Sequence, residues 1–211
     1  MKIKLSVYLA IALMAAACTE GASKGRGARG EQQATSARSV EVEPADPLKR
    51  AQAAAMEFNK RLRATLESAV ENQGPAAAIE VCSLSAPAIA DEVMRAHSLR
   101  LGRVAAPGKN RHPDHAAEGW TWDALAEMIE AVEAGAPTSE QVKVIREELP
   151  EGVELRMVRG IPTEALCTRC HGESIEPEIE AKLRELYPGD GATGFREGTL
   201  RGALWVEVTT M

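Results

Sequence analysis

The segment Cys167-Thr168-Arg169-Cys170-His171 constrains this chain more than any other stretch of its sequence. C-x-x-C-H is the pattern of covalent haem attachment. Two thiols at this spacing can add across the two vinyl groups of one haem, and the adjacent histidine can then coordinate the iron through an imidazole nitrogen. The motif therefore predicts one covalent haem c, with Cys167 and Cys170 as thioether anchors and His171 as an axial ligand.

Three other interpretations of the cysteine pair compete with haem. A redox-active disulfide of the thioredoxin type needs a βαβ context with a longer apolar strand before the motif. A structural zinc site needs further ligands at suitable spacing, and the only other cysteine beyond the N-terminal segment is the distant Cys82. A structural disulfide requires that the chain be exported, which the N-terminal residues discussed next predict. Export also favours haem, because c-type haem is attached outside the bacterial cytoplasm.

The N-terminal residues predict export. Two lysines precede an apolar run over residues 5–17 that ends in three alanines. This run is short for a permanent membrane span and is typical of a signal peptide, which we place at residues 1–17. Cys18 follows, as in the bacterial lipoprotein signal, although Ala15 departs from the Leu or Val preferred there. We expect a protein of the periplasm or cell envelope, lipid-anchored through Cys18; plain cleavage that leaves an incidental cysteine is the alternative.

Composition changes after the signal peptide. Residues 21–39 are rich in Gly, Ala, Ser and Arg without apolar periodicity, so residues 18–45 are predicted to be a disordered tether and residues 46–211 a folded haem domain. The net charge of -6 argues against a nucleic-acid partner, which requires clustered positive charge. No second apolar stretch reaches membrane-spanning length, so membrane contact is expected only through the lipid.

The apolar pattern predicts helices first and antiparallel strands afterwards. Asp46-Pro47 should start a long helix that Gly74-Pro75 ends. A second helical stretch should break in two just after Cys82, because Pro87 interrupts it. The remaining predicted elements are a short strand over 99–105, a helix over 122–134, a hairpin of 141–147 with 153–159, a short helix over 177–187 and a last strand over 203–209. This order predicts an α+β domain.

A bound haem has a second axial face, and the residues alone leave its ligand open. Cys82 and Met128 lie on apolar helical stripes, where a core role is common. His112 and His115 lie in a polar loop, where histidines are usually solvated. The full set of candidates is Cys82, Met94, His97, His112, His115, Met128 and Met157.

Several stretches resemble a small family of bacterial c-type haem domains with a PAS-like fold, first recognised in a cyanobacterial protein and catalogued as a domain of unknown function. They are residues 78–83 with 86–90, residues 167–172, and residues 187–195 with Gly198 and 201–203. Together they extend over most of the range 46–209. The resemblance implies a PAS-like antiparallel sheet with N-terminal helices packed against it. It also implies that the Cys82 thiolate is the distal ligand, opposite His171.

One loop departs from that family. Where the family has two asparagines, this chain has His112 and His115. Imidazole ligates iron well, so either histidine could compete with Cys82 once the iron is reduced and binds thiolate less strongly.

The expected ligand set favours a role without catalysis. Two protein ligands leave no open coordination position, so we expect no enzyme activity. An anionic thiolate stabilises ferric iron and makes the potential more negative. We therefore expect a low-potential electron-transfer protein with an unknown redox partner; the alternative is a haem-based redox or gas sensor that acts through a signalling partner. Arg196 and Arg201 are candidates for propionate contacts, with a solvated surface arginine as the alternative.

Overall fold

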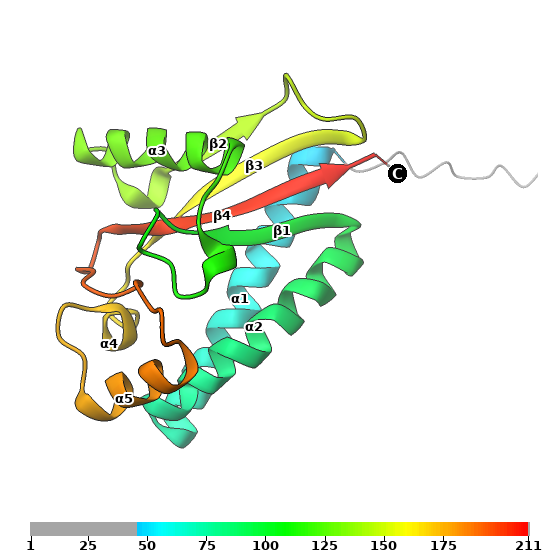
Figure 1. The fold of residues 1–211 in the computed structure, drawn as a ribbon. Helices are drawn as coiled ribbons and strands as arrows, with labels where there is room; N and C mark the ends of the chain where they lie inside the picture. The colour runs from blue at the N-terminus through cyan, green and yellow to red at the C-terminus, as the bar shows by residue number, and fades with distance from the viewer. Residues whose placement is uncertain (1–45, 211) are drawn as a thin grey trace, which may run out of the picture. The chain divides into compact units, whose positions relative to one another are not determined.

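The structure is a computed structural model, and it describes residues 46–210. This part of the chain forms five α-helices and one antiparallel sheet with the strand order β1-β4-β3-β2 (Figure 1). The elements are α1 (Pro47–Gln73), α2 (Pro75–His97), β1 (Leu99–Val104), α3 (Trp120–Glu133), β2 (Val142–Ile145), β3 (Val153–Pro162), α4 (Thr168–His171), α5 (Pro177–Leu186) and β4 (Leu200–Thr209). The predicted α+β fold, with N-terminal helices against an antiparallel sheet, is confirmed.

Three predictions concern residues outside this range. The signal peptide over residues 1–17, the tether over 18–45 and the lipidation of Cys18 all lie outside the described residues. Among the helices that the structure describes, none combines the length and apolar character needed to cross a membrane.

Helix α1 begins and ends at the residues that the sequence indicates. The Asp46 side chain accepts a hydrogen bond from the Leu48 amide at 2.9 Å, and Pro47 occupies the first helical position. Gly74 ends the helix with a φ of +87°, a conformation that L side chains rarely adopt. The buried residues of the helix are Ala51, Ala54, Ala55, Phe58 and Ala69.

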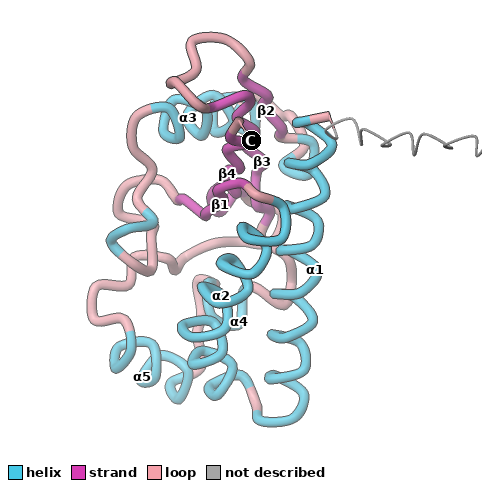
Figure 2. Tube along the Cα trace, turned by 90° about the vertical axis from the view of Figure 1, so that its right-hand side faces the viewer, coloured by secondary structure: helices cyan, strands magenta, loops and turns pink. Residues whose placement is uncertain are grey.

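The predicted break after Cys82 is wrong, because α2 runs unbroken through Pro87. A proline inside a helix removes one backbone hydrogen bond and crowds the preceding turn. Here α2 lies alongside α1 in both views (Figures 1 and 2), and this packing compensates for the loss by burying Ala78, Ile79, Ala86, Ile89 and Val93. Cys82 is therefore presented from a continuous helix rather than from a helix end.

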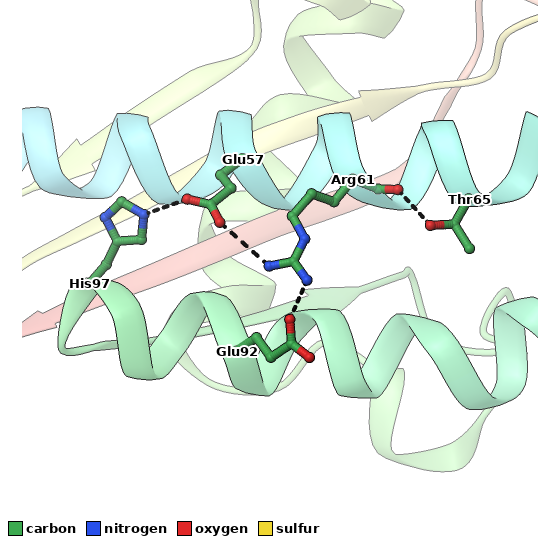
Figure 3. Close-up of polar contacts among 5 residues, drawn as sticks. All are labelled: Glu57, Arg61, Thr65, Glu92 and His97. Carbon is green, nitrogen blue, oxygen red and sulfur yellow. Dashed lines mark hydrogen bonds and ion pairs between the residues drawn. The ribbon is translucent and has the colours of Figure 1, made fainter. Parts of the chain in front are cut away.

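Ion pairs join α1 and α2 on their partly exposed side (Figure 3). His97 contacts the Glu57 carboxylate at 2.9 Å, and Arg61 bridges from Glu57 to Glu92 on α2. The hydrogen bond from His97 lowers the pKa of Glu57. His97 thus has a carboxylate partner at the helix pair.

The sheet is packed on both faces. The face toward α1 and α2 carries Leu99, Leu101, Leu155, Met157, Leu204, Val206 and Val208. The opposite face packs against α3, where Leu125 and Met128 meet Val158 and Ala203. Met94 packs against the first of these two cores. Three of the candidate iron ligands, Met94, Met128 and Met157, therefore serve as core side chains.

Strand β4 starts earlier than predicted, inside the glycine-containing stretch before residue 203. Ile161 pairs with Gly202, and Pro162 with Leu200. A Cβ at Gly202 would lie 2.2 Å from the Val104 carbonyl oxygen. Gly202 therefore permits a close approach of β4 to β1 and does not mark a turn.

Candidate functional site

One cavity of about 640 Å³ brings together side chains from α2, β1, α4, β4 and the loop after β1. Cys82 and His171 both line it, although they come from distant parts of the sequence. Arg103 and Arg201 line it from the sheet, and Arg111 from the loop. This volume lies in the range of about 300–1,000 Å³ that is typical of cofactor sites.

His171 lies in a single helical turn with the two cysteines of its motif. The backbone amides of Cys170 and His171 donate to the Cys167 carbonyl at 3.2 and 2.9 Å. Cys167 and Cys170 are free thiols, and burial raises the pKa of Cys170. Gly172 is required next, because a Cβ there would lie 2.3 Å from the Thr168 carbonyl oxygen. The turn therefore presents two thiols and one imidazole from a short segment of the chain, residues 167–171.

The His171 ring is held in one tautomer. Its Nε2 lies 2.8 Å from Nη1 of Arg201, and because a guanidinium has donors only, Nε2 must accept. Nδ1 then carries the proton and donates to the Ala192 carbonyl at 2.7 Å. Burial, and then the charges of Arg201 and Arg111, hold the pKa of His171 well below its usual value. A neutral imidazole with a fixed Nδ1–H and an unprotonated Nε2 is the form that binds metals.

A buried ion pair fixes the turn that holds His171. Arg111 contacts Oδ2 of Asp190 at 3.0 and 3.1 Å and also donates to the Cys170 carbonyl at 2.8 Å. The other carboxylate oxygen of Asp190 accepts from the Ala192 amide at 2.8 Å. Arg111 and Asp190 are thus positioning residues, since they connect the Cys170 backbone to the carbonyl that accepts from His171.

Replacing Asp190 with alanine should destabilise the protein by about 3–5 kcal/mol, because it leaves a buried arginine without its carboxylate. The two side chains are only 12% and 8% exposed. Glu173→Ala is the matched control: it breaks the Arg196 pair, whose side chains are 75% and 53% exposed, and should cost about 0–1 kcal/mol. Urea denaturation measures both. Equal losses of stability would contradict the positioning role.

Two opposing effects act on the pKa of the Cys82 thiol. Burial raises the pKa of Cys82, while Arg103, Arg111 and Arg201 lower it. A buried thiol near several guanidiniums could ionise on binding a metal ion, because the positive charges favour the thiolate.

Of the seven residues considered as distal ligands, three line the cavity: Cys82, His112 and His115. The rings of His112 and His115 lie 5.7 Å apart. Burial lowers the pKa of His115, which favours the neutral form that can bind iron. The structure thus places both loop histidines beside the same space as Cys82.

Sequence reasoning missed Arg103, Arg111 and Asp190. A signal for Arg103 was present, because Leu99, Leu101 and Arg103 alternate along β1 and should share its inward face. Arg196, the other candidate for a propionate contact, instead pairs with Glu173 at 2.8 Å and is largely exposed. Arg201 is the candidate that lines the cavity.

The lining fits an iron porphyrin. Imidazole and thiolate are both groups that can ligate haem iron, His171 and Cys82 supply one of each, and Cys167 and Cys170 lie in the same turn as His171. Nε of Arg201 is buried without a hydrogen-bond partner in the described part of the chain, which is expected of a group that meets an acceptor on a bound molecule.

Comparisons with known proteins agree with this fold. A family model described as Tll0287-like matches residues 30–209. A solved structure described as the cyanobacterial heme-protein Tll0287 is 23% identical, with a TM-score of 0.56, and the match covers 79% of this chain and 98% of that chain. No curated protein matches the chain. Since the family model spans most of the sequence and the solved relative shares its fold, this chain belongs to the Tll0287-like family.

Proposed function

We propose that this chain is an exported c-type haem protein that carries one covalent haem and transfers electrons at low potential. The observation that carries the proposal is that Cys82 and His171 line one cavity, with Cys167 and Cys170 in the turn that ends at His171. The solved relative is described as a heme-protein, which supports a haem in this fold. Cys167 and Cys170 would form the thioethers, and His171 and the Cys82 thiolate would hold the iron.

The haem, when bound, would supply a one-electron couple, and the protein's residues would set its properties. The backbone acceptor of His171 raises the basicity of that imidazole and fixes its orientation. The Cys82 thiolate contributes negative charge, which favours the ferric form and so lowers the reduction potential.

A carrier is proposed rather than an enzyme, because His171 and Cys82 would occupy both axial positions. The partner would be a redox protein of the cell envelope. Export through residues 1–17 and a lipid on Cys18 belong to the same proposal, since covalent haem attachment requires export.

The alternative is a sensor that acts through a partner. The observation that favours it is that His112 and His115 line the cavity beside Cys82. Either imidazole could replace a thiolate that reduction has weakened, and the exchange would move the loop over residues 107–115.

Carbon monoxide binding distinguishes the two functions. We expect the reduced holoprotein to remain six-coordinate, to bind carbon monoxide slowly and to exchange electrons rapidly with a small redox mediator. Stopped-flow absorption measures all three. Rapid carbon monoxide binding with loss of Cys82 ligation would contradict the carrier and support the sensor. The His112→Ala/His115→Ala variant then reports whether a loop histidine takes part, because only in that case does it change the ferrous spectrum.

A further inference from the structure

Three arginines line the cavity, and they differ in whether a carboxylate neutralises their charge. Arg103, Arg111 and Arg201 all line it. Arg111 is paired with Asp190. Within residues 46–210, neither Arg103 nor Arg201 has a carboxylate within ion-pair distance. The cavity therefore contains two guanidiniums whose charge the described residues leave uncompensated.

Arg103 points inward from β1. Its guanidinium lies 5.8 Å from the centre of the Phe58 ring. Burial, and then the charge of Arg201, lower the pKa of Arg103. Arginine nevertheless stays protonated in proteins. A charge in this environment is costly unless an anion accompanies it.

Arg201 reaches the same cavity from β4. One of its terminal nitrogens contacts Nε2 of His171 at 2.8 Å, while its own Nε is buried without a partner. Burial lowers the pKa of Arg201 as well. On the proposed function its contact with His171 would be lost, because a metal at Nε2 would take the lone pair to which Arg201 donates.

We propose that Arg103 and Arg201 form an anion subsite that binds the two carboxylates of the porphyrin. The inference rests on the proposed haem and deepens it, because it names the groups that recognise the cofactor's polar edge. Two uncompensated guanidiniums match two propionates in charge, and arginine binds carboxylates through paired N–H donors. Ligation at His171 would release the Arg201 guanidinium, and a propionate would supply the acceptor that the released donors and Nε need.

The holoprotein gives the first test. In Arg103→Met and Arg201→Met, covalent haem and the ferric ligand spectrum should be retained, because Cys82 and His171 are both present and a bound metal ion itself favours the thiolate. Each loss of positive charge should lower the reduction potential. At a fixed solution potential the ratio of reduced to oxidised protein should fall about tenfold, which corresponds to about 59 mV for a one-electron couple. In redox-difference infrared spectra with propionate-labelled haem, the carboxylate bands of each variant should be shifted from those of the wild type. Arg103→Lys should restore most of the potential.

Two arginines serve as matched controls. Arg100 lies on the same strand as Arg103 and is 60% exposed, and Arg196 precedes β4 and is 75% exposed. Their methionine variants should leave both the potential and the carboxylate bands unchanged. If Arg103→Met and Arg201→Met behave like these controls while haem stays attached, the anion subsite is wrong and the proposed function stands.

A second measurement does not depend on haem attachment. The full chain with reduced thiols is titrated with metal-free protoporphyrin IX, which retains both carboxylates, and with its dimethyl ester, which has none that ionise. The wild type should prefer the free acid, and each arginine variant should weaken that binding by at least about tenfold, the loss expected for one charged hydrogen bond. Equal binding of acid and ester would overturn the subsite. If this chain prefers the free acid but the exported protein carries no covalent haem, the subsite is upheld and the proposed function is refuted.

Discussion

Exported protein carrying both Cys167→Ala and Cys170→Ala should retain no covalently bound haem. The two thiols are the proposed attachment points, and they lie with His171 in one helical turn, so removing both leaves nothing to form a thioether. Each single variant should retain one thioether and show a haemochrome band shifted toward that of haem with an unreacted vinyl group. Acid–acetone extraction followed by haem staining of the denatured protein measures the covalent fraction.

The control for this experiment is Arg169→Ala. Arg169 lies between the two cysteines and is exposed, so its side chain has no part in attachment and the variant should retain full haem content. Haem that stays bound after both thiols are removed would show that the attachment lies elsewhere. A disulfide or zinc role for the pair would then have to be reconsidered.

Replacing Cys82 with alanine should leave covalent haem in place and change the ferric absorption spectrum. The variant loses the only thiol that lines the cavity within residues 46–210, and with it the anionic ligand that favours ferric iron. The reduction potential should therefore rise, on the order of 0.1 V or more within the roughly 0.8 V that axial ligands span. Absorption spectra and spectroelectrochemical titration measure the two changes.

Ser83 provides the matched control, because it also lines the cavity and precedes Pro87 on the same helix. Ser83→Ala should keep both the wild-type ferric spectrum and the wild-type potential. A ferric spectrum that stays unchanged in Cys82→Ala would refute the thiolate ligand while leaving covalent attachment intact. Adding His112→Ala and His115→Ala to Cys82→Ala would reveal whether a loop imidazole replaces the lost thiolate.

Local signals in the sequence were sufficient for much of the fold. The cap at Asp46, the positive φ at Gly74 and the hairpin between β2 and β3 depend on a few neighbouring residues. Such features are predictable because a side-chain oxygen, a missing Cβ or an alternating pattern acts over a few residues.

Features that depend on distant packing were predicted wrongly. Pro87 disfavours a helix locally, yet contact with α1 keeps α2 continuous. Gly202 was predicted to lie outside the last strand, yet it belongs to β4 and lies beside the Val104 carbonyl. In both cases the deciding contact comes from a segment far away in the sequence.

The residues of the candidate site also differ in whether they could be predicted from local sequence. The turn from Cys167 to His171 is a local motif and could be recognised directly. The choice of Cys82 rested on a family resemblance, and the structure adds that this thiol lines the cavity with His171. Arg111 and Asp190 are far apart in the sequence, so their contact could be identified only from the folded structure.

Covalent haem in the exported wild-type protein tests the account most directly. The chain is expressed with the bacterial machinery for c-type haem attachment, purified from the cell envelope, extracted with acidic acetone and assayed as its pyridine haemochrome. The account predicts one haem per chain that resists extraction and gives the spectrum of a porphyrin with both vinyl groups saturated. Haem that is absent, or that the solvent removes, would contradict it.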